Sequence, residues 1–86
     1  MRFTIEERHL TDESGRPVTS ADGVEFHTFD AETIDEAVQL YMRRDAAELI
    51  GNVLKFPGFQ AMATVRKSSG VYTLQFTPTS QQLSLR

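Results

Sequence analysis

The sequence predicts an α+β domain: an antiparallel sheet of four to five strands packed against one helix, in the approximate order ββαβββ. Apolar and polar residues alternate near both ends of the chain, and a segment between them has the apolar spacing of a helix. Short connections rich in glycine, proline and serine separate the last three alternating segments. The chain has 86 residues, which fits a single domain over residues 1–86.

The first two strands are predicted from alternation with a period of two. Phe3 and Ile5 alternate with polar neighbours, and residues 12–15 supply turn-forming side chains and a glycine. Val24 and Phe26 then alternate with a glutamate and a histidine. We therefore expect an N-terminal pair of strands that precedes the helix.

The helix is predicted from its start signal and its apolar stripe. Thr33 and Glu36 have the spacing of a capping box, in which each side chain accepts a hydrogen bond from the backbone near the other. Acidic residues in the first turn and Arg43 and Arg44 in the last turn suit the helix dipole. The stripe at spacings of three and four consists of Ile34, Ala37, Val38, Tyr41 and Met42.

Asp45 leaves two interpretations open. A straight continuation of the helix would place its carboxylate within the apolar stripe, where an unpaired charge is costly. One interpretation is that the helix stops or kinks near Arg44, restarts with Asp45 as its cap, and ends at Gly51. The other is that Asp45 is a buried functional acid.

Three strands are predicted to form a C-terminal meander, over residues 52–56, 59–67 and 71–77. If Arg66 lies opposite Val71, the alanines of the second strand share the core face with the large apolar residues of the third. Across the first connection, the same argument pairs Phe56 with Phe59 and turns both toward the core. We expect residues 80–86 to fray, because they have no strong apolar pattern.

The charge distribution indicates where a partner would bind. All twelve acidic residues lie between Glu6 and Glu48, so residues 49–86 contain no carboxylate side chain. One helix covers only one face of a sheet, and the other face of the meander is predicted to be free of acids. The predicted interface residues on that face are Lys55, Met62, Thr64, Arg66, Val71, Thr73 and Gln75. The sequence does not determine a function, and it best fits a non-enzymatic interaction module that forms a homo-oligomer or docks on a protein partner.

Nucleic-acid binding is an alternative interpretation. Lys55, Arg66 and Lys67 would contact phosphate groups. The net charge of −3 and the pI near 5.2 count against it.

A metal site is a further alternative. Glu7 and His9 share one strand face, as do Glu25 and His27, and adjacent strands would bring these donors together. Because an acid two residues from a histidine is common on solvated strands, we expect no metal and no cofactor. An enzyme would need a site between subunits, built from residues such as His27, Asp45 and Tyr41.

Two features that the sequence lacks indicate the cellular compartment of the protein. The chain has no cysteine, so disulfides and thiolate metal sites are excluded. Its N-terminus alternates rather than forming an apolar run, and no window approaches the roughly 18 apolar residues of a membrane span. We expect a cytoplasmic protein that does not enter a membrane.

Overall fold

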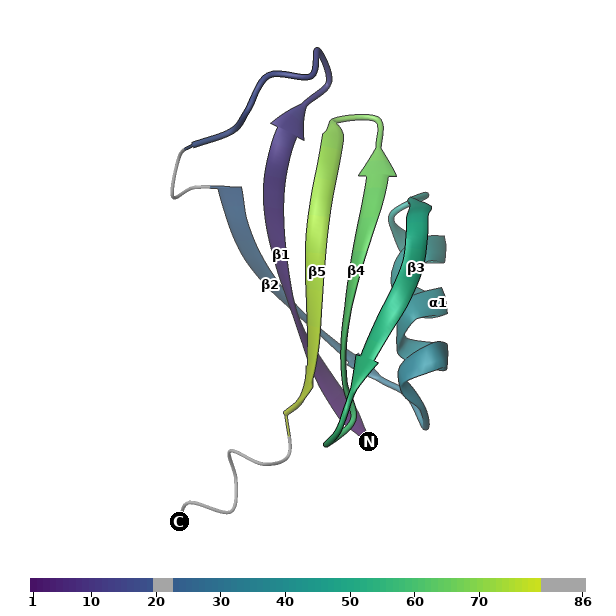
Figure 1. The fold of residues 1–86 in the computed structure, drawn as a ribbon. Coiled ribbons are helices and arrows are strands. Elements are labelled where there is room, and N and C mark those ends of the chain that lie inside the picture. The colour runs from purple at the N-terminus through teal and green to yellow at the C-terminus, as the bar shows by residue number, and fades with distance from the viewer. Residues whose placement is uncertain (20–22, 80–86) are drawn as a thin grey trace.

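The computed structural model describes residues 1–19 and 23–79 of the chain. It is an α+β fold in which one helix packs on an antiparallel five-stranded sheet of order β2-β1-β5-β4-β3, which confirms the predicted ββαβββ arrangement (Figure 1). The elements are β1 (Arg2–Asp12), β2 (Val24–Asp30), α1 (Ile34–Arg44), β3 (Glu48–Phe56), β4 (Gln60–Lys67) and β5 (Gly70–Pro78). The expected fraying of residues 80–86 concerns residues outside the described part.

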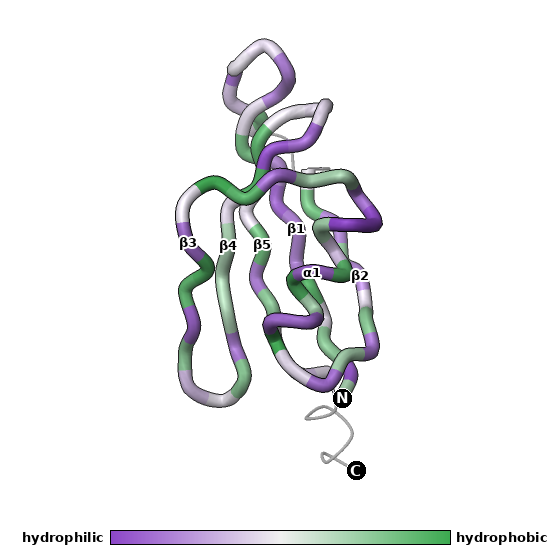
Figure 2. The backbone as a smooth tube through the Cα atoms, turned by 90° about the vertical axis from the view of Figure 1, so that its right-hand side faces the viewer, coloured by the Kyte–Doolittle hydropathy of each residue, from purple (hydrophilic) through white to green (hydrophobic). Residues whose placement is uncertain are grey.

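The core lies between the sheet and α1, which runs along one side of it (Figure 1). Figure 2 views the sheet from this side, with α1 in front of the strands. The largest fully buried side chains are Tyr41 from the helix and Phe3, Ile5, Val65, Leu74 and Phe76 from the three central strands. Alternate residues of these strands therefore face α1, as their period of two requires.

The start of α1 follows the predicted capping pattern in part. Thr33 Oγ1 accepts a hydrogen bond from the backbone amide of Glu36 at 3.1 Å. The Glu36 carboxylate accepts from the backbone amide of Glu32 at 2.7 Å, one residue before the expected partner. Both bonds satisfy amides at the N-terminal end of the helix.

The end of α1 corrects the prediction of a second helical segment. The helix ends at Arg44, and Asp45 caps its C-terminus instead of starting another helix. Ala46 has a φ of 51°, a left-handed conformation that ends the helix. Residues from Glu48 onward then form β3, so Gly51 does not close a helix but lies in a strand with a φ of 78°. Pairing with β4 decides the structure of this segment, which a local pattern could not reveal.

The register between β4 and β5 is the predicted one. Arg66 lies opposite Val71, and Ala63 lies opposite Leu74 on the helix side. Small residues beneath the helix face large ones on the neighbouring strand.

The register between β3 and β4 differs from the expectation by one residue. Phe56 pairs with Gln60, because Phe59 belongs to the loop and has a φ of 59°. A shift of one residue exchanges the two faces of a strand. Leu54 and Phe56 therefore lie on the outer face, and Lys55 lies on the helix side, where its ammonium group is 2.8 Å from the Asp35 carboxylate.

Val53 also differs from the prediction. It has the same parity as Lys55, which was predicted to lie on the outer face, but it is partly buried against the core. The pairing of β3 with β4 is interrupted between Ile50 and Leu54, and Gly51 adopts a positive φ at this irregularity.

Within residues 1–19 and 23–79, no helix is long and apolar enough to cross a membrane.

Candidate functional site

The outer face is the side of the sheet that α1 leaves uncovered (Figure 1). Six of the seven predicted interface residues share it: Met62, Thr64 and Arg66 on β4 lie opposite Gln75, Thr73 and Val71 on β5. Lys55 does not, because the register of β3 turns it toward the helix. The structure thus assembles a contiguous surface from β4 and β5, without Lys55.

The charges of the outer face are balanced by pairs. The expectation of an acid-free face holds for β4 and β5 but is wrong for β3, because Glu48 lies opposite Arg66 on this face. β1 and β2 extend the face and add further carboxylates. Each of these acids has a basic neighbour: the pairs are Arg2–Asp30 at 3.2 Å, Arg8–Glu6 at 2.7 Å and Arg66–Glu48 at 3.6 Å.

Exposed apolar side chains lie on the same face. Leu54 of β3 is opposite Met62 of β4, with Phe56 two residues along β3. Their exposed fractions are 58%, 39% and 46%, and Phe26 on β2 is 66% exposed. Three of the four are neighbours, and a cluster of large apolar residues on a strand pair is typical of a contact surface.

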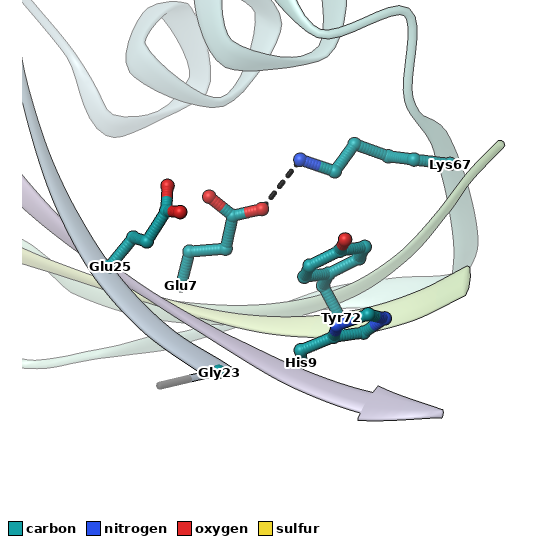
Figure 3. Close-up of a pocket in the computed structure, with 6 residues that line it drawn as sticks. All are labelled: Glu7, His9, Gly23, Glu25, Lys67 and Tyr72. Atoms are coloured by element: carbon teal, nitrogen blue, oxygen red, sulfur yellow. Dashed lines mark hydrogen bonds and ion pairs between the residues drawn. The ribbon is translucent and has the colours of Figure 1, made fainter. Parts of the chain in front are cut away.

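A second region lies on the helix side, at the C-terminal end of α1. Here β1 contributes Glu7, which alternates in phase with the buried Phe3 and Ile5 and is itself 4% exposed. Its carboxylate is 2.6 Å from His27 Nε2 on β2. Its other oxygen is 2.5 Å from Lys67 Nζ on β4 (Figure 3). A buried carboxylate is thus held between two partners.

The network continues to the end of the helix. Lys67 Nζ also donates to Asp45 at 3.0 Å. Arg44 donates to the other Asp45 oxygen at 2.6 Å and approaches His27 Nδ1 at 3.3 Å. We call Glu7, His27, Arg44, Asp45 and Lys67 the charged cluster; it joins β1, β2 and β4 to the end of α1.

The pKa values of the cluster follow from these contacts. Burial would raise the pKa of Glu7, but hydrogen bonds from Lys67 and His27 outweigh it and lower the pKa. The hydrogen bond from Arg44, assisted by Lys67, lowers the pKa of Asp45 to about 2. Burial opposes the charge of Lys67, yet its hydrogen bonds to Glu7 and other partners raise its pKa. Both acids and the lysine are therefore ionised at neutral pH.

Tyr41 lies beside this cluster. Its ring is 5.4 Å from Lys67 Nζ and 6.3 Å from the ring of His27. Its buried hydroxyl has no hydrogen-bond partner among the described residues, and burial raises its pKa. His27, Asp45 and Tyr41, which were expected to meet only between subunits, therefore lie together in one chain.

A polar cavity of about 190 Å³ opens next to the cluster. It is lined by Glu7, His9, Gly23, Glu25, Lys67 and Tyr72 (Figure 3). Glu7, Glu25 and His27 place their ligand atoms within 4.8 Å of one another. His9 instead stacks on Tyr72 with ring centroids 4.2 Å apart. Three of the four donors considered from the sequence therefore converge, and His9 does not join them.

The three residues considered for nucleic-acid binding do not form one surface. Lys55 and Lys67 lie on the helix side, and Arg66 lies on the outer face. Each pairs with a carboxylate: the partners are Asp35, Glu7 with Asp45, and Glu48. This arrangement does not provide the continuous basic surface that phosphate contacts require.

Comparison of the chain with protein-family models, curated proteins and solved structures found no match.

The sequence contains a signal for the charged cluster. Glu7 has the parity of Phe3 and Ile5, and Lys67 has the parity of Ala63 and Val65. The alternation of side chains along a strand therefore predicts that both face the core. Two opposite charges on core-facing positions predict a buried pair. The contribution of Asp45 depended on where the helix ends.

Proposed function

We propose that the protein is an interaction module that self-associates, with the outer face of one copy packing on the outer face of a second. The observation that carries this proposal is the combination of paired charges and exposed apolar residues on one uncovered sheet face. Leu54, Phe56 and Met62 form its apolar part, and the threonines of β4 and β5 lie beside it.

Sheet packing explains what a second copy would supply. One helix covers one side of the five-stranded sheet, and two sheets commonly pack face to face about 10 Å apart. A dimer of this kind would have the layers helix, sheet, sheet, helix. It would bury Leu54, Phe56 and Met62, and the free energy gained is about 25 cal/mol for each Å² of apolar surface removed from water.

Charge favours a second copy as the occupant. The chain carries a net charge of −3, yet each acid of the outer face has a basic partner on the same face. Two such faces approach each other without the repulsion that the acidic remainder of the chain would cause. A two-fold axis places the same patch on both sides of the contact, so the exposed apolar residues would meet each other.

The test is light scattering coupled to size exclusion, over a concentration range of about 100-fold. We expect a dimer in the wild-type protein. Met62→Asp places a charge within the apolar patch and is expected to shift the protein to monomer, with an unchanged circular dichroism spectrum. Thr73→Asp should act in the same direction, because Thr73 lies on the same face.

The matched control is Gln39→Asp, which adds the same charge on the exposed side of α1. It should dimerise as the wild type does. A wild-type monomer at all concentrations would contradict the proposal, and so would a Met62→Asp variant that still dimerises.

A further inference from the structure

Glu7 and Glu25 form a like-charge pair in the sheet. They lie directly opposite each other on β1 and β2, and both side chains point toward the helix side (Figure 3). Like charges in this position destabilise a sheet. Lys67 neutralises the negative charge of Glu7. Among the described residues, Glu25 has only His27 within ion-pair distance, with its carboxylate 3.7 Å from His27 Nε2. An additional positive charge beside these two carboxylates would therefore be stabilising.

The donor atoms around this pair are arranged for a cation. His27 Nε2 is 2.6 Å from a Glu7 oxygen, and the ligand atoms of Glu7, Glu25 and His27 lie within 4.8 Å of one another. Ligands around a tetrahedral zinc ion are about 3.4 Å apart, for bonds of about 2.1 Å. The Glu25 side chain is 70% exposed, so it is free to turn inward by the remaining distance.

We propose that Glu7, Glu25 and His27 bind one divalent transition-metal ion, such as Zn²⁺, at the edge of the polar cavity. Two carboxylate oxygens and one imidazole nitrogen make a donor set that suits Zn²⁺. Mg²⁺ and Ca²⁺ prefer oxygen donors alone, so the imidazole selects against them. The fourth position faces the cavity, where a water molecule would complete the coordination.

The surroundings of the site support this assignment. Lys67 donates to one Glu7 oxygen and leaves the other toward His27, and ligating carboxylates commonly have such an outer hydrogen bond. The positive charge of Lys67 is shared with Asp45, which limits its repulsion of a metal ion.

His27 would change tautomer when the metal binds. The Arg44 guanidinium can only donate, so His27 Nδ1 accepts from it and the ring proton lies on Nε2, which donates to Glu7. A metal ion on Nε2 displaces the proton from that nitrogen, so the ring carries its proton on Nδ1 instead. Arg44 loses one contact of 3.3 Å and keeps its bonds to Asp45.

The first test is calorimetric titration of the full chain, without a histidine tag, with Zn²⁺ alone. We expect saturable binding of one ion per chain and much weaker binding of Mg²⁺ and Ca²⁺. His27→Gln and Glu25→Gln should each weaken binding by at least about tenfold, since loss of a supporting residue alone costs about 10- to 100-fold. Glu25 is largely exposed, so its variant tests the site even if His27→Gln fails to fold.

His9→Ala is the matched control. It removes the other histidine of the chain, which lines the same cavity but stacks on Tyr72. Zinc affinity should be unchanged. Equal losses in His9→Ala and His27→Gln would contradict the assignment of ligands, and so would binding that survives Glu25→Gln and His27→Gln together.

The second test observes the imidazole nitrogens by NMR. Addition of Zn²⁺ should convert His27 from the Nε2–H to the Nδ1–H tautomer, while the His9 signals keep their pattern. An absence of saturable zinc binding, or a His27 ring that keeps its Nε2 proton in excess zinc, would overturn the proposal.

Discussion

The two faces of the sheet carry the same kind of ion pair in opposite surroundings. Lys67 and Glu7 on the helix side have side-chain exposures of 14% and 5%, whereas Arg66 and Glu48 on the outer face are 60% and 75% exposed. Lys67 and Arg66 are adjacent in the sequence. The alternation of a strand therefore sends two neighbouring cations into different roles.

Burial decides what each pair contributes. An exposed pair is screened by water and typically contributes 0–1 kcal/mol, whereas a buried pair becomes costly when one partner is lost. The buried pair also joins β1 and β4 to Asp45 at the end of α1, so it holds the C-terminal end of the helix against the sheet. The exposed pairs neutralise the outer face, and this is the property that a self-contact needs.

The largest expected effect comes from breaking the buried side of this comparison. Lys67→Met should destabilise the fold by about 3–5 kcal/mol, because it leaves the Glu7 and Asp45 carboxylates without their shared cation. Arg66→Met, one residue earlier on the same strand, should cost less than about 1 kcal/mol. Urea denaturation of both variants measures the difference. Equal losses in the two variants would show that burial does not distinguish the pairs.

The acid dependence of stability is the next largest effect. The pKa of Asp45 is about 2 in the folded state against an ordinary 3.8, and that of Glu7 is also lowered from 4.5. A lowered folded-state pKa stabilises the protein above the unfolded pKa, and this contribution is lost as the pH falls toward the folded value. The free energy of unfolding should therefore decrease as the pH falls from about 5 to about 2.

Asp45→Asn should reduce this decrease by about 1–2 kcal/mol, since each unit of pKa corresponds to about 1.4 kcal/mol. Asp35→Asn is the control, because Asp35 is 67% exposed at the other end of α1. Urea titrations at a series of pH values provide the measurement. A decrease that is as steep in Asp45→Asn as in the wild type would exclude Asp45 as its source.

The fold was predictable where one face of an element is buried. The alternation of Phe3 and Ile5 and the stripe of α1 predicted the layers, and the parity of Arg66 and Val71 predicted the register of β4 on β5. These signals are local or involve neighbouring strands. Six of the seven predicted interface residues reached the same face for this reason.

The errors arise where the backbone has an unusual conformation. Phe59 adopts a positive φ, which is uncommon for residues other than glycine and is not predicted by its residue type. The resulting loop places Leu54 and Phe56 on the outer face, where Lys55 was predicted. Ala46 likewise ends the helix with a φ of 51°. The convergence of the charged cluster depends on that helix end and on the register between β1 and β2, which the sequence does not specify.

The smallest predicted effect concerns the loop that decides which face Leu54 occupies. Phe59 has a φ of 59°, a strained value for a residue with a side chain, and its side chain is 60% exposed. Phe59→Gly should stabilise the protein by up to about 1 kcal/mol, because glycine adopts this conformation freely and little buried contact is lost.

Phe59→Ala is the control, since it removes the same ring but keeps the strain. It should be no more stable than the wild type in urea denaturation. If Phe59→Gly were the less stable of the two variants, contacts of the ring could not be the reason, because both lack it. The loop would then not be strained at this residue.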